Sequence, residues 1–378
     1  MARKKEKNKR QYNFSKVRIS IFLIFTILLA TFAFAFKTPI ENLVNNNSTT
    51  SVIDYNGLVV HTIDVGQAEA IMIKLPDGKN MMVDSGNTGS EKNEKLKSYL
   101  LNNYFQNVEN QEIDYFVLTH SDTDHIGGAV MIFDTFQVNK VFRPNIYAAK
   151  SSEDLARMSE NELSDSGTEW GNVVEKMYEE PNCEITFSKA GIEIVESLYS
   201  IKFYAPNQTK YGTTTKIDKN SYSPIIVIEY SSRIFMLTGD ATETTENESL
   251  ENLPEVDILN VAHHGSKSSS TSEFLAKIKP KYAIISSNKN DGAGKTYGHP
   301  NTETLNRLKM YMSENKIFRT DTNGNIVTTI SQSGEISFIL DVQSNSFYIK
   351  VEYILLCGVA VLFVLCFKIQ TNGKKSSK

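Results

Sequence analysis

The chain has 378 residues, of which 40% are hydrophobic, and this composition suffices for one large hydrophobic core or two smaller ones. Twelve of the 40 Lys and Arg residues, but only one of the 44 acidic residues, stand in segments 1–18 and 368–378, so residues 19–367 carry a net charge of −15. This charge argues against a sequence-independent binder of duplex DNA, although it leaves room for a local basic channel. Cys183 is the only cysteine between the apolar ends, which excludes a disulfide within the central part and fits an exported or a cytosolic protein equally.

Apolar runs at both ends predict a membrane protein. Residues 17–36 are almost continuously apolar, which is the length of a transmembrane helix, and they follow the basic segment 1–16. A cleaved signal peptide is the alternative, and both interpretations export the domain. Residues 351–367 form a second apolar run before the basic tail 368–378, with a buried core helix as the alternative. We therefore expect both termini in the cytoplasm and the intervening domain outside the cell membrane.

Residues 37–54 predict a polar linker, and residues 55–342 predict one α/β domain. Alternating and continuous apolar runs indicate its strands, and a longer helical period indicates its helices. In chain order, the first half has predicted strands over 58–63, 70–75 and 80–83, a helix over 91–104, a strand over 113–118 and a helix over 126–136. The first three strands form a meander, and the later strand, loop and helix place any ligands in the loop at the carboxyl end of a sheet strand.

Metal-binding side chains are dense directly after the strand 113–118. His120, Asp122, Asp124 and His125 stand within six residues, on a turn that two glycines close. Two imidazoles and two carboxylates at this spacing predict a metal site. The alternative is ordinary polar turn chemistry with histidines on either side.

The second half begins with an acidic, Ser-rich insertion over 144–200, with predicted helices over 152–158 and 170–178. The insertion forms either one wall of an active-site cleft or a peripheral decoration. Further predicted elements are strands over 201–204, 225–230, 233–237, 256–261 and 281–286, a helix over 302–312, and two or three antiparallel strands within 317–338 around a hairpin signal at 322–325.

Further polar side chains follow these strands. Asp240 comes directly after a strand, and His263 and His264 follow the next one. His299 precedes the helix over 302–312, where a helix N-terminus favours an anion such as a phosphoryl oxygen. Surface histidines and a helix-entry histidine without chemistry are the alternatives.

These motifs together resemble the metal-binding signature of the metallo-β-lactamase superfamily, in the variant of ComEC-type competence proteins, where Asp122 replaces a histidine. The resemblance covers roughly residues 57–340 and implies a bacterial protein with an αββα four-layer sandwich. The apolar runs 17–36 and 351–367 predict that N- and C-terminal transmembrane helices flank this sandwich. The further matches are, in the family's order, His61-Thr-Ile-Asp-Val-Gly-Gln67, Met82-Val-Asp84-Ser-Gly86, Leu237-Thr-Gly-Asp240, His263-His264-Gly265-Ser266 and Tyr297-Gly-His299-Pro300.

The resemblance also implies roles for individual residues. The implied metal ligands are His120, Asp122, Asp124, His125, a bridging Asp240, and either His263 or His264. For Asp84, the resemblance implies that its side chain supports the metal loop through hydrogen bonds. It implies a similar role for Asp64 and Gln67. Asn220 and Ser223 match an Asn-x-x-Ser element that stands where most members supply another metal-binding histidine, so one metal position lacks that ligand.

The expected chemistry is metal-dependent hydrolysis. Two divalent ions are expected, Zn because of the imidazoles or Mn because of the carboxylates, and they would activate a shared hydroxide for in-line attack. Asp124 is expected to orient the hydroxide, and His299 to stabilise the oxyanion or the leaving group.

The first hypothesis is a membrane-anchored extracellular phosphodiesterase or nuclease of the ComEC-like type, which degrades one DNA strand beside a separate channel protein. One alternative is a cell-wall phosphoesterase for teichoic-acid or phosphocholine groups, and another is a non-catalytic surface binding module. The dense carboxylates argue against the binding module, because they would repel one another without cations.

Overall fold

The computed structural model describes residues 56–106, 108, 110–148, 163–213, 216–288 and 292–341. The predicted segments 1–16, 17–36, 37–54, 351–367 and 368–378, and the predicted helix over 152–158, lie outside the described residues. Within the described part of the chain, none of the helices combines the length and the apolar character that a membrane span requires.

The first sheet begins with the predicted meander, because β1 pairs antiparallel with β2 and β2 pairs antiparallel with β3. Strands β3, β5 and β7 then run parallel. The spatial order of its eight strands is β10 (Glu184–Phe187), β7 (Lys140–Arg143), β5 (Tyr115–Val117), β3 (Asn80–Val83), β2 (Ile71–Lys74), β1 (Gly57–Thr62), β20 (Ile326–Ser331) and β21 (Ile336–Leu340).

The second sheet starts antiparallel through β12, β15 and β16 and continues parallel through β17, β18 and β19. Its seven strands lie in the order β11 (Glu193–Val195), β12 (Tyr199–Phe203), β15 (Ile226–Tyr230), β16 (Arg233–Leu237), β17 (Ile258–Asn260), β18 (Tyr282–Ile285) and β19 (Ile317–Arg319). Three small sheets pair β4 (Glu112–Ile113) with β6 (Gln137–Val138), β8 (Tyr147–Ala148) with β9 (Ser164–Asp165), and β13 (Gly212–Thr213) with β14 (Lys216–Ile217).

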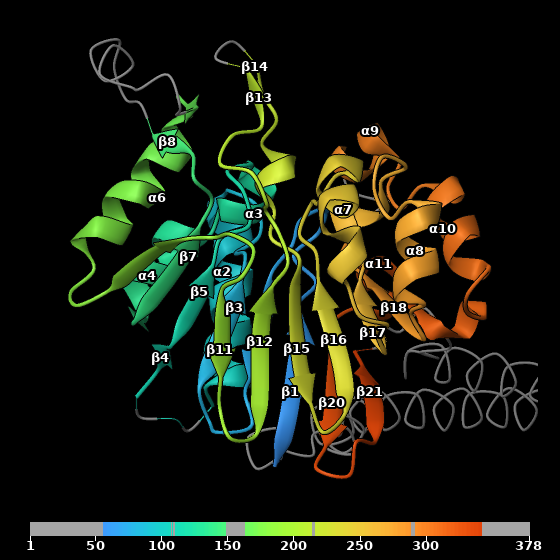
Figure 1. Cartoon of the computed structure of the whole chain (residues 1–378). Helices are drawn as coiled ribbons and strands as arrows, with labels where there is room; N and C mark the ends of the chain where they lie inside the picture. The colour runs from blue at the N-terminus through green and yellow to red at the C-terminus, as the bar shows by residue number, and fades with distance from the viewer. Residues whose placement is uncertain are drawn as a thin grey trace, which may run out of the picture. The chain divides into compact units, whose positions relative to one another are not determined.

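Helices cover the outer faces of both sheets (Figure 1). The α-helices are α2 (Ser90–Tyr99), α3 (Thr123–Ile126), α4 (Ala129–Thr135), α6 (Thr168–Glu179), α7 (Glu243–Ser249), α8 (Ser272–Ile278), α9 (Gly292–Tyr297), α10 (Thr302–Lys309) and α11 (Thr320–Asn323). A π-helical turn, η2 (Leu100–Tyr104), follows α2, and short 3-10 turns are η3 (Asn220–Tyr222), η4 (Leu250–Asn252), η5 (Ala262–Gly265) and η6 (Glu314–Lys316).

Three hydrophobic cores separate the four layers. One core joins the first sheet to α2, α4 and α6 and includes Phe116 and Trp170, and another joins the second sheet to α8 and α10 and includes Leu259 and Phe274. The third core lies between the sheets, where Val117 belongs to the same cluster as residues of β12, β15 and β16. Strands that are buried on both faces, such as β1, explain the continuous apolar runs in the sequence. The αββα sandwich predicted from the sequence is therefore confirmed.

The predicted helix over 126–136 is interrupted. Helix α3 starts at Thr123, inside the metal motif, and α4 starts only at Ala129. A Cβ atom on Gly127 would lie 2.0 Å from the backbone nitrogen of Thr88, so the chain can pass this point only as glycine. The helix is divided at Gly127 and Gly128, where the chain passes close to residues 87 and 88.

The prediction of an antiparallel hairpin around 322–325 is wrong. Strand β19 pairs parallel with β18 in the second sheet, whereas β20 pairs with β1 in the first sheet. Between them the chain forms α11 and turns at Gly324, which has a φ of 67°. The Asn-Gly signal marks a turn correctly, but the partners of the flanking strands are decided by the packing of the two sheets. The hairpin lies one strand later, between β20 and β21.

The motif residues follow strands whose carboxyl ends meet at one edge of the sandwich. Asp84 follows β3, His120 follows β5, Asp240 follows β16 and His264 follows β17. Loops from both sheets therefore converge at this edge.

Candidate metal centre

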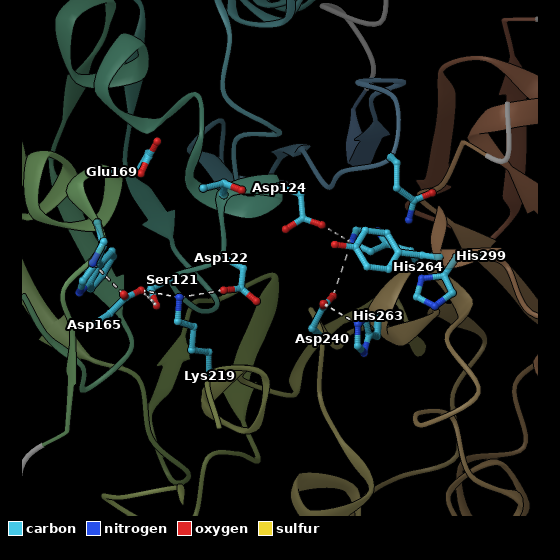
Figure 2. Close-up of a pocket in the computed structure, with 15 residues that line it drawn as sticks. Ser121, Asp122, Asp124, Asp165, Glu169, Lys219, Asp240, His263, His264 and His299 are labelled. Atoms are coloured by element: carbon cyan, nitrogen blue, oxygen red, sulfur yellow. Dashed lines mark hydrogen bonds and ion pairs between the residues drawn. The ribbon is translucent and has the colours of Figure 1, made fainter. Parts of the chain in front are cut away.

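A cavity of about 360 Å³ lies where the loops after β5, β16 and β17 meet (Figure 2). Acidic and imidazole side chains dominate its wall. They include Asp122, Asp124, Asp240, His263, His264 and His299. The insertion contributes Asp165 and Trp170 to the wall, so it lies against the cavity rather than apart from it.

Two histidines at this cavity have defined tautomers. His264 Nδ1 lies 2.8 Å from the carbonyl oxygen of Ser286, which can only accept, so Nδ1 carries the hydrogen. His125 Nδ1 lies 2.6 Å from a carboxylate oxygen of Asp84 and likewise donates. Both neutral rings therefore present an unprotonated Nε2, and these two nitrogens lie 3.2 Å apart.

The tautomer of His120 follows from its neighbour Thr119. Thr119 Oγ1 donates its one hydrogen to Asp84 over 2.7 Å. The same oxygen lies 3.0 Å from His120 Nδ1, so it accepts a hydrogen bond from that nitrogen. His120 Nε2 is then the free acceptor, and it is buried without a hydrogen-bond partner among the described residues.

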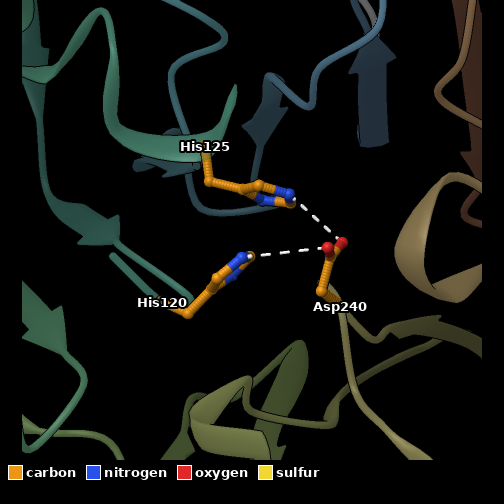
Figure 3. Close-up of side chains that lie close together, drawn as sticks. All are labelled: His120, His125 and Asp240. Atoms are coloured by element: carbon orange, nitrogen blue, oxygen red, sulfur yellow. Dashed lines mark ion pairs between the residues drawn. The ribbon is translucent and has the colours of Figure 1, made fainter. Parts of the chain in front are cut away.

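Three imidazole lone pairs thus converge on Asp240: Figure 3 shows the rings of His120 and His125 facing its carboxylate, and His264 Nε2 lies 3.8 Å from Asp240 Oδ1. His125 Nε2 lies 3.1 Å from one carboxylate oxygen of Asp240, and His120 Nε2 lies 3.8 Å from the other. Lone pairs and carboxylates that face one another in a buried site repel unless a cation lies between them. Two groups have the geometry to hold an ion, namely His120, His125 and Asp240, and Asp124, His125 and His264. The donor set therefore fits a divalent metal ion.

The pKa shifts of the site residues also show that this site favours positive charge when no metal is bound. Burial opposes charge on His264, but Asp240 and Asp124 outweigh it and raise the pKa of His264 to about 9. Burial also opposes charge on His125, and Asp240 and Asp84 raise its pKa well above the usual value. Burial opposes ionisation of Asp240, yet His125 above all holds the pKa of Asp240 well below its usual range. Without metal, protons on the histidines meet this demand.

The two adjacent histidines after β17 have different surroundings. Both adopt left-handed backbone angles, with φ of 54° and 53°, which are uncommon outside glycine. His264 is buried and belongs to one of the groups that can hold an ion. The His263 side chain is 25% exposed, and its Nε2 lies 3.5 Å from Asp240 Oδ2 and 3.4 Å from Asn220 Nδ2. The geometry therefore favours His264 as the ligand.

The two carboxylates of the metal motif, Asp122 and Asp124, also have different surroundings. Asp124 belongs to the group with His125 and His264. Asp122 belongs to neither group; its side chain is 40% exposed, and one oxygen lies 3.0 Å from Lys219 Nζ. Its other oxygen lies 3.7 Å from His120 Nε2, so Asp122 lies between that histidine and Lys219.

The residues expected to support the centre have distinct contacts. Asp84 accepts from Thr119 and His125, and Ser223 Oγ accepts from the Asp240 N–H over 3.1 Å. Gln67 lines the cavity, and its carbonyl oxygen accepts from Asn288 N.

Asp64 has a different environment. It accepts from Gly66 N and pairs with Lys95, and its own N–H donates to Asn325. These contacts are those of a turn aspartate.

Three charged residues near the centre were not predicted from the sequence. Lys219 and Asp165 line the cavity, where their charged groups lie 2.7 Å apart. The only local sign of Lys219 is its position next to Asn220, and nothing near Asp165 marks it. Glu69 is fully buried, and burial above all raises its pKa to about 8, so it is largely protonated at neutral pH. Glu69 stands two residues after Gln67, within reach of the same motif.

Comparison with known proteins relates part of this chain to a family. Residues 63–188 match the family described as the metallo-beta-lactamase superfamily. This part of the chain is similar to a metallo-beta-lactamase domain. This superfamily usually binds divalent metals, which agrees with the donor set around Asp240.

Two curated relatives of the metallo-beta-lactamase domain are competence proteins of the ComEC type, so the predicted resemblance is confirmed. The chain is 26% identical to ComE operon protein 3 of Bacillus subtilis over 279 residues, which are 71% of this chain and 32% of that protein. It is 28% identical to Recombination protein 2 of Haemophilus influenzae over 257 residues, which are 67% of this chain and 27% of that protein. The chain thus spans about a third or less of the length of these relatives.

A solved structure is also similar. The metallo-beta-lactamase fold protein YhfI from Bacillus subtilis aligns with a TM-score of 0.41 and 12% identity, over 75% of this chain and 99% of that chain.

Proposed function

We propose that this chain is a metal-dependent phosphodiesterase. The observation that carries the proposal is the convergence of three imidazole lone pairs, from His120, His125 and His264, on the buried carboxylate of Asp240. A non-catalytic binding module would have no need of such a buried donor set, which must take up either metal ions or protons.

The position with the most candidate ligands combines Asp124, His125 and His264 with one oxygen of Asp240. A divalent cation there would supply Lewis-acid activation of water and neutralise charge that develops on a phosphoryl group. Imidazole and carboxylate ligands together suit Zn or Mn.

Two cavity residues have roles of their own. The Asp124 side chain is 27% exposed, and the cavity wall includes it, so its carboxylate can orient an attacking water. Burial, followed by the nearby His263 and His264, lowers the pKa of His299 to about 4. A neutral His299 at pH 7 donates through its one N–H to a phosphoryl or leaving-group oxygen.

DNA is the first substrate class to test, because the two curated relatives are competence proteins of the ComEC type and one of them is named Recombination protein 2. The net charge of −15 between residues 19 and 367 favours a single strand held by a few local contacts over a duplex held along a basic groove. The proposal includes a location at the cell membrane with the domain outside, which rests on the apolar runs 17–36 and 351–367.

The full-length protein, purified in detergent, tests the proposal through hydrolysis of bis-p-nitrophenyl phosphate. Chelation should abolish hydrolysis, and added Zn²⁺ or Mn²⁺ should restore it. Asp240→Ala should lose at least about 100-fold in rate, because removing a ligand exceeds the 10–100-fold cost of losing a supporting hydrogen bond. Asp134→Ala removes an exposed aspartate of α4 that pairs with Lys176, and it should keep the rate of the unmodified chain.

Absence of hydrolysis by a metal-loaded protein would reject the phosphodiesterase and favour the binding module. If hydrolysis occurs, single-stranded DNA, duplex DNA and teichoic-acid polymer are compared as substrates. A preference for the polymer over DNA would transfer the proposal to a cell-wall phosphoesterase.

A further inference from the structure

An ammonium group lies beside the candidate metal centre. Lys219 Nζ is 3.0 Å from Asp122 Oδ1 and 2.7 Å from Asp165 Oδ2 (Figure 2). Asp165 is itself held by Ser121 Oγ at 2.7 Å and by Gly167 N at 2.9 Å, so its carboxylate is a firm anchor. Lys219 thus joins the insertion to the metal motif.

Ligand geometry limits how many ions the centre can hold. Both groups with the geometry to hold an ion include His125, but its one free Nε2 can bind only one ion. If His125 serves the ion with Asp124 and His264, the other position keeps two buried ligands, His120 and Asp240. Catalytic zinc sites usually have three protein ligands.

The remaining candidates for that second position do not complete it. His263 Nε2 lies 3.5 Å from Asp240 Oδ2, but His263 belongs to neither group of side chains with the geometry to hold an ion. Ser223 Oγ accepts a hydrogen bond from Asp240 N, and the nitrogen of His120 that it approaches, at 3.4 Å, is Nδ1 rather than the metal-facing Nε2. Asp122 Oδ2 is 3.7 Å from His120 Nε2, but its other oxygen is bound to Lys219. The ammonium group of Lys219 therefore already pairs with the negative charge of Asp122 that a second divalent ion would need.

We propose that the ammonium of Lys219 takes the place of a second metal ion, so that the centre holds one divalent ion and binds a phosphoryl oxygen of the substrate through Lys219. This inference rests on the proposed phosphodiesterase function. Two of the three ammonium N–H bonds have partners among the described side chains, Asp122 and Asp165, which leaves the third for an anionic oxygen facing the cavity. The arrangement departs from the two ions expected from the sequence.

Metal content per chain tests the replacement directly. The full-length protein and its variants are equilibrated with Zn²⁺ or Mn²⁺, freed of unbound metal and measured by elemental analysis. The unmodified chain should hold one ion. Lys219→Met keeps an apolar stem but frees Asp122, and it should bind a second ion at elevated metal concentration.

Two matched variants control for folding and for loss of a surface charge. Lys219→Arg keeps the positive charge and should hold one ion. Lys202→Met removes a lysine that pairs with Glu193 on the second sheet, away from the cavity, and should also hold one ion. In addition, Lys219→Met should raise KM for bis-p-nitrophenyl phosphate roughly tenfold or more, because it removes a hydrogen bond to a charged group.

Two ions in the unmodified chain, or one ion in Lys219→Met at every metal concentration, would overturn the inference. Failure of the proposed function looks different. A chain that binds one ion and gains a second in Lys219→Met, but hydrolyses no phosphodiester, keeps the charge replacement and loses the phosphodiesterase. If the unmodified chain binds two ions and hydrolyses a phosphodiester, the phosphodiesterase proposal is kept and the charge replacement by Lys219 is rejected.

Discussion

Asp84 shows how one residue outside the ligand set orients the centre. Its carboxylate is fully buried and accepts three hydrogen bonds, from Thr119 N, Thr119 Oγ1 and His125 Nδ1, at 2.6 to 2.8 Å. Through Thr119 it also fixes the tautomer of His120. Two of the three metal-facing nitrogens therefore depend on this one side chain.

Asp84→Asn should weaken metal binding by roughly 10–100-fold, since carboxylates that hold ligand histidines have this effect. Asparagine tolerates the φ of 55° at this position, so the backbone should be kept. Its amide nitrogen, however, donates toward groups that themselves donate. Competition against a chromophoric chelator measures the affinity, with Asp134→Asn as an exposed control. Equal affinity in both variants would argue against the supporting role of Asp84.

At the scale of elements, the insertion is anchored by α6. Trp170 is fully buried, its Nε1–H donates to the Ile146 carbonyl, and the Arg143 guanidinium lies 4.9 Å from its ring. The same helix begins directly after Asp165 and Gly167, which line the cavity. Packing of α6 against the first sheet therefore also positions the carboxylate that holds Lys219.

Trp170→Ala should lower the free energy of unfolding by about 3–5 kcal/mol, the usual cost of truncating a buried aromatic side chain to alanine. Urea denaturation followed by circular dichroism measures it, because the variant lacks the only tryptophan. Asn172→Ala, on the exposed face of the same helix, should change stability by less than about 0.5 kcal/mol. A similarly small change for Trp170→Ala would mean that the insertion is a loose decoration.

At the scale of the whole molecule, the candidate ligands come from both halves of the sandwich. His120, Asp124 and His125 follow a strand of the first sheet, whereas Asp240 and His264 follow strands of the second. A bound ion would therefore link the two sheets at the edge where their loops meet. Any ligand that binds the folded chain alone stabilises it, by about 2.7 kcal/mol at 100 times its Kd.

This link predicts a dependence of stability on pH. The pKa of His264 rises from 6.5 to about 9 on folding without metal, so its proton stabilises the metal-free fold fully below pH 6.5. That contribution is lost as the pH rises from 6.5 to 9. Glu69, with a pKa raised to about 8, adds a loss of the same sign between pH 4.5 and 8. Metal competes with the proton of His264, so metal affinity should rise over the window from 6.5 to 9.

Thermal unfolding of chelated and metal-loaded protein between pH 6 and 9.5 checks both signs. The Tm of the chelated protein should fall across this range, and the difference between the two forms should widen. His264→Asn should reduce the fall, and the remainder should reflect His125 and Glu69, whose pKa values are also raised. A Tm of the chelated protein that rises from pH 6.5 to 9 would contradict the assignment of His264.

The sequence by itself determines many of the strand positions and the ligand types, because apolar periodicity and spacing within one turn are local properties of the chain. The segment from Thr119 to Gly128, for example, contains two histidines and two aspartates at a fixed spacing, whatever the position of β5 in the sheet. The four-layer class follows from the resemblance of its motifs to a known family, and β7, β10 and β11 were not predicted. Tertiary structure alone decides which ligands meet. Packing of the two sheets turns His264 inward rather than His263, brings Lys219 and Asp165 from distant segments to Asp122, and sends β19 and β20 to different sheets. These choices depend on contacts between residues far apart in the chain, which no local pattern encodes.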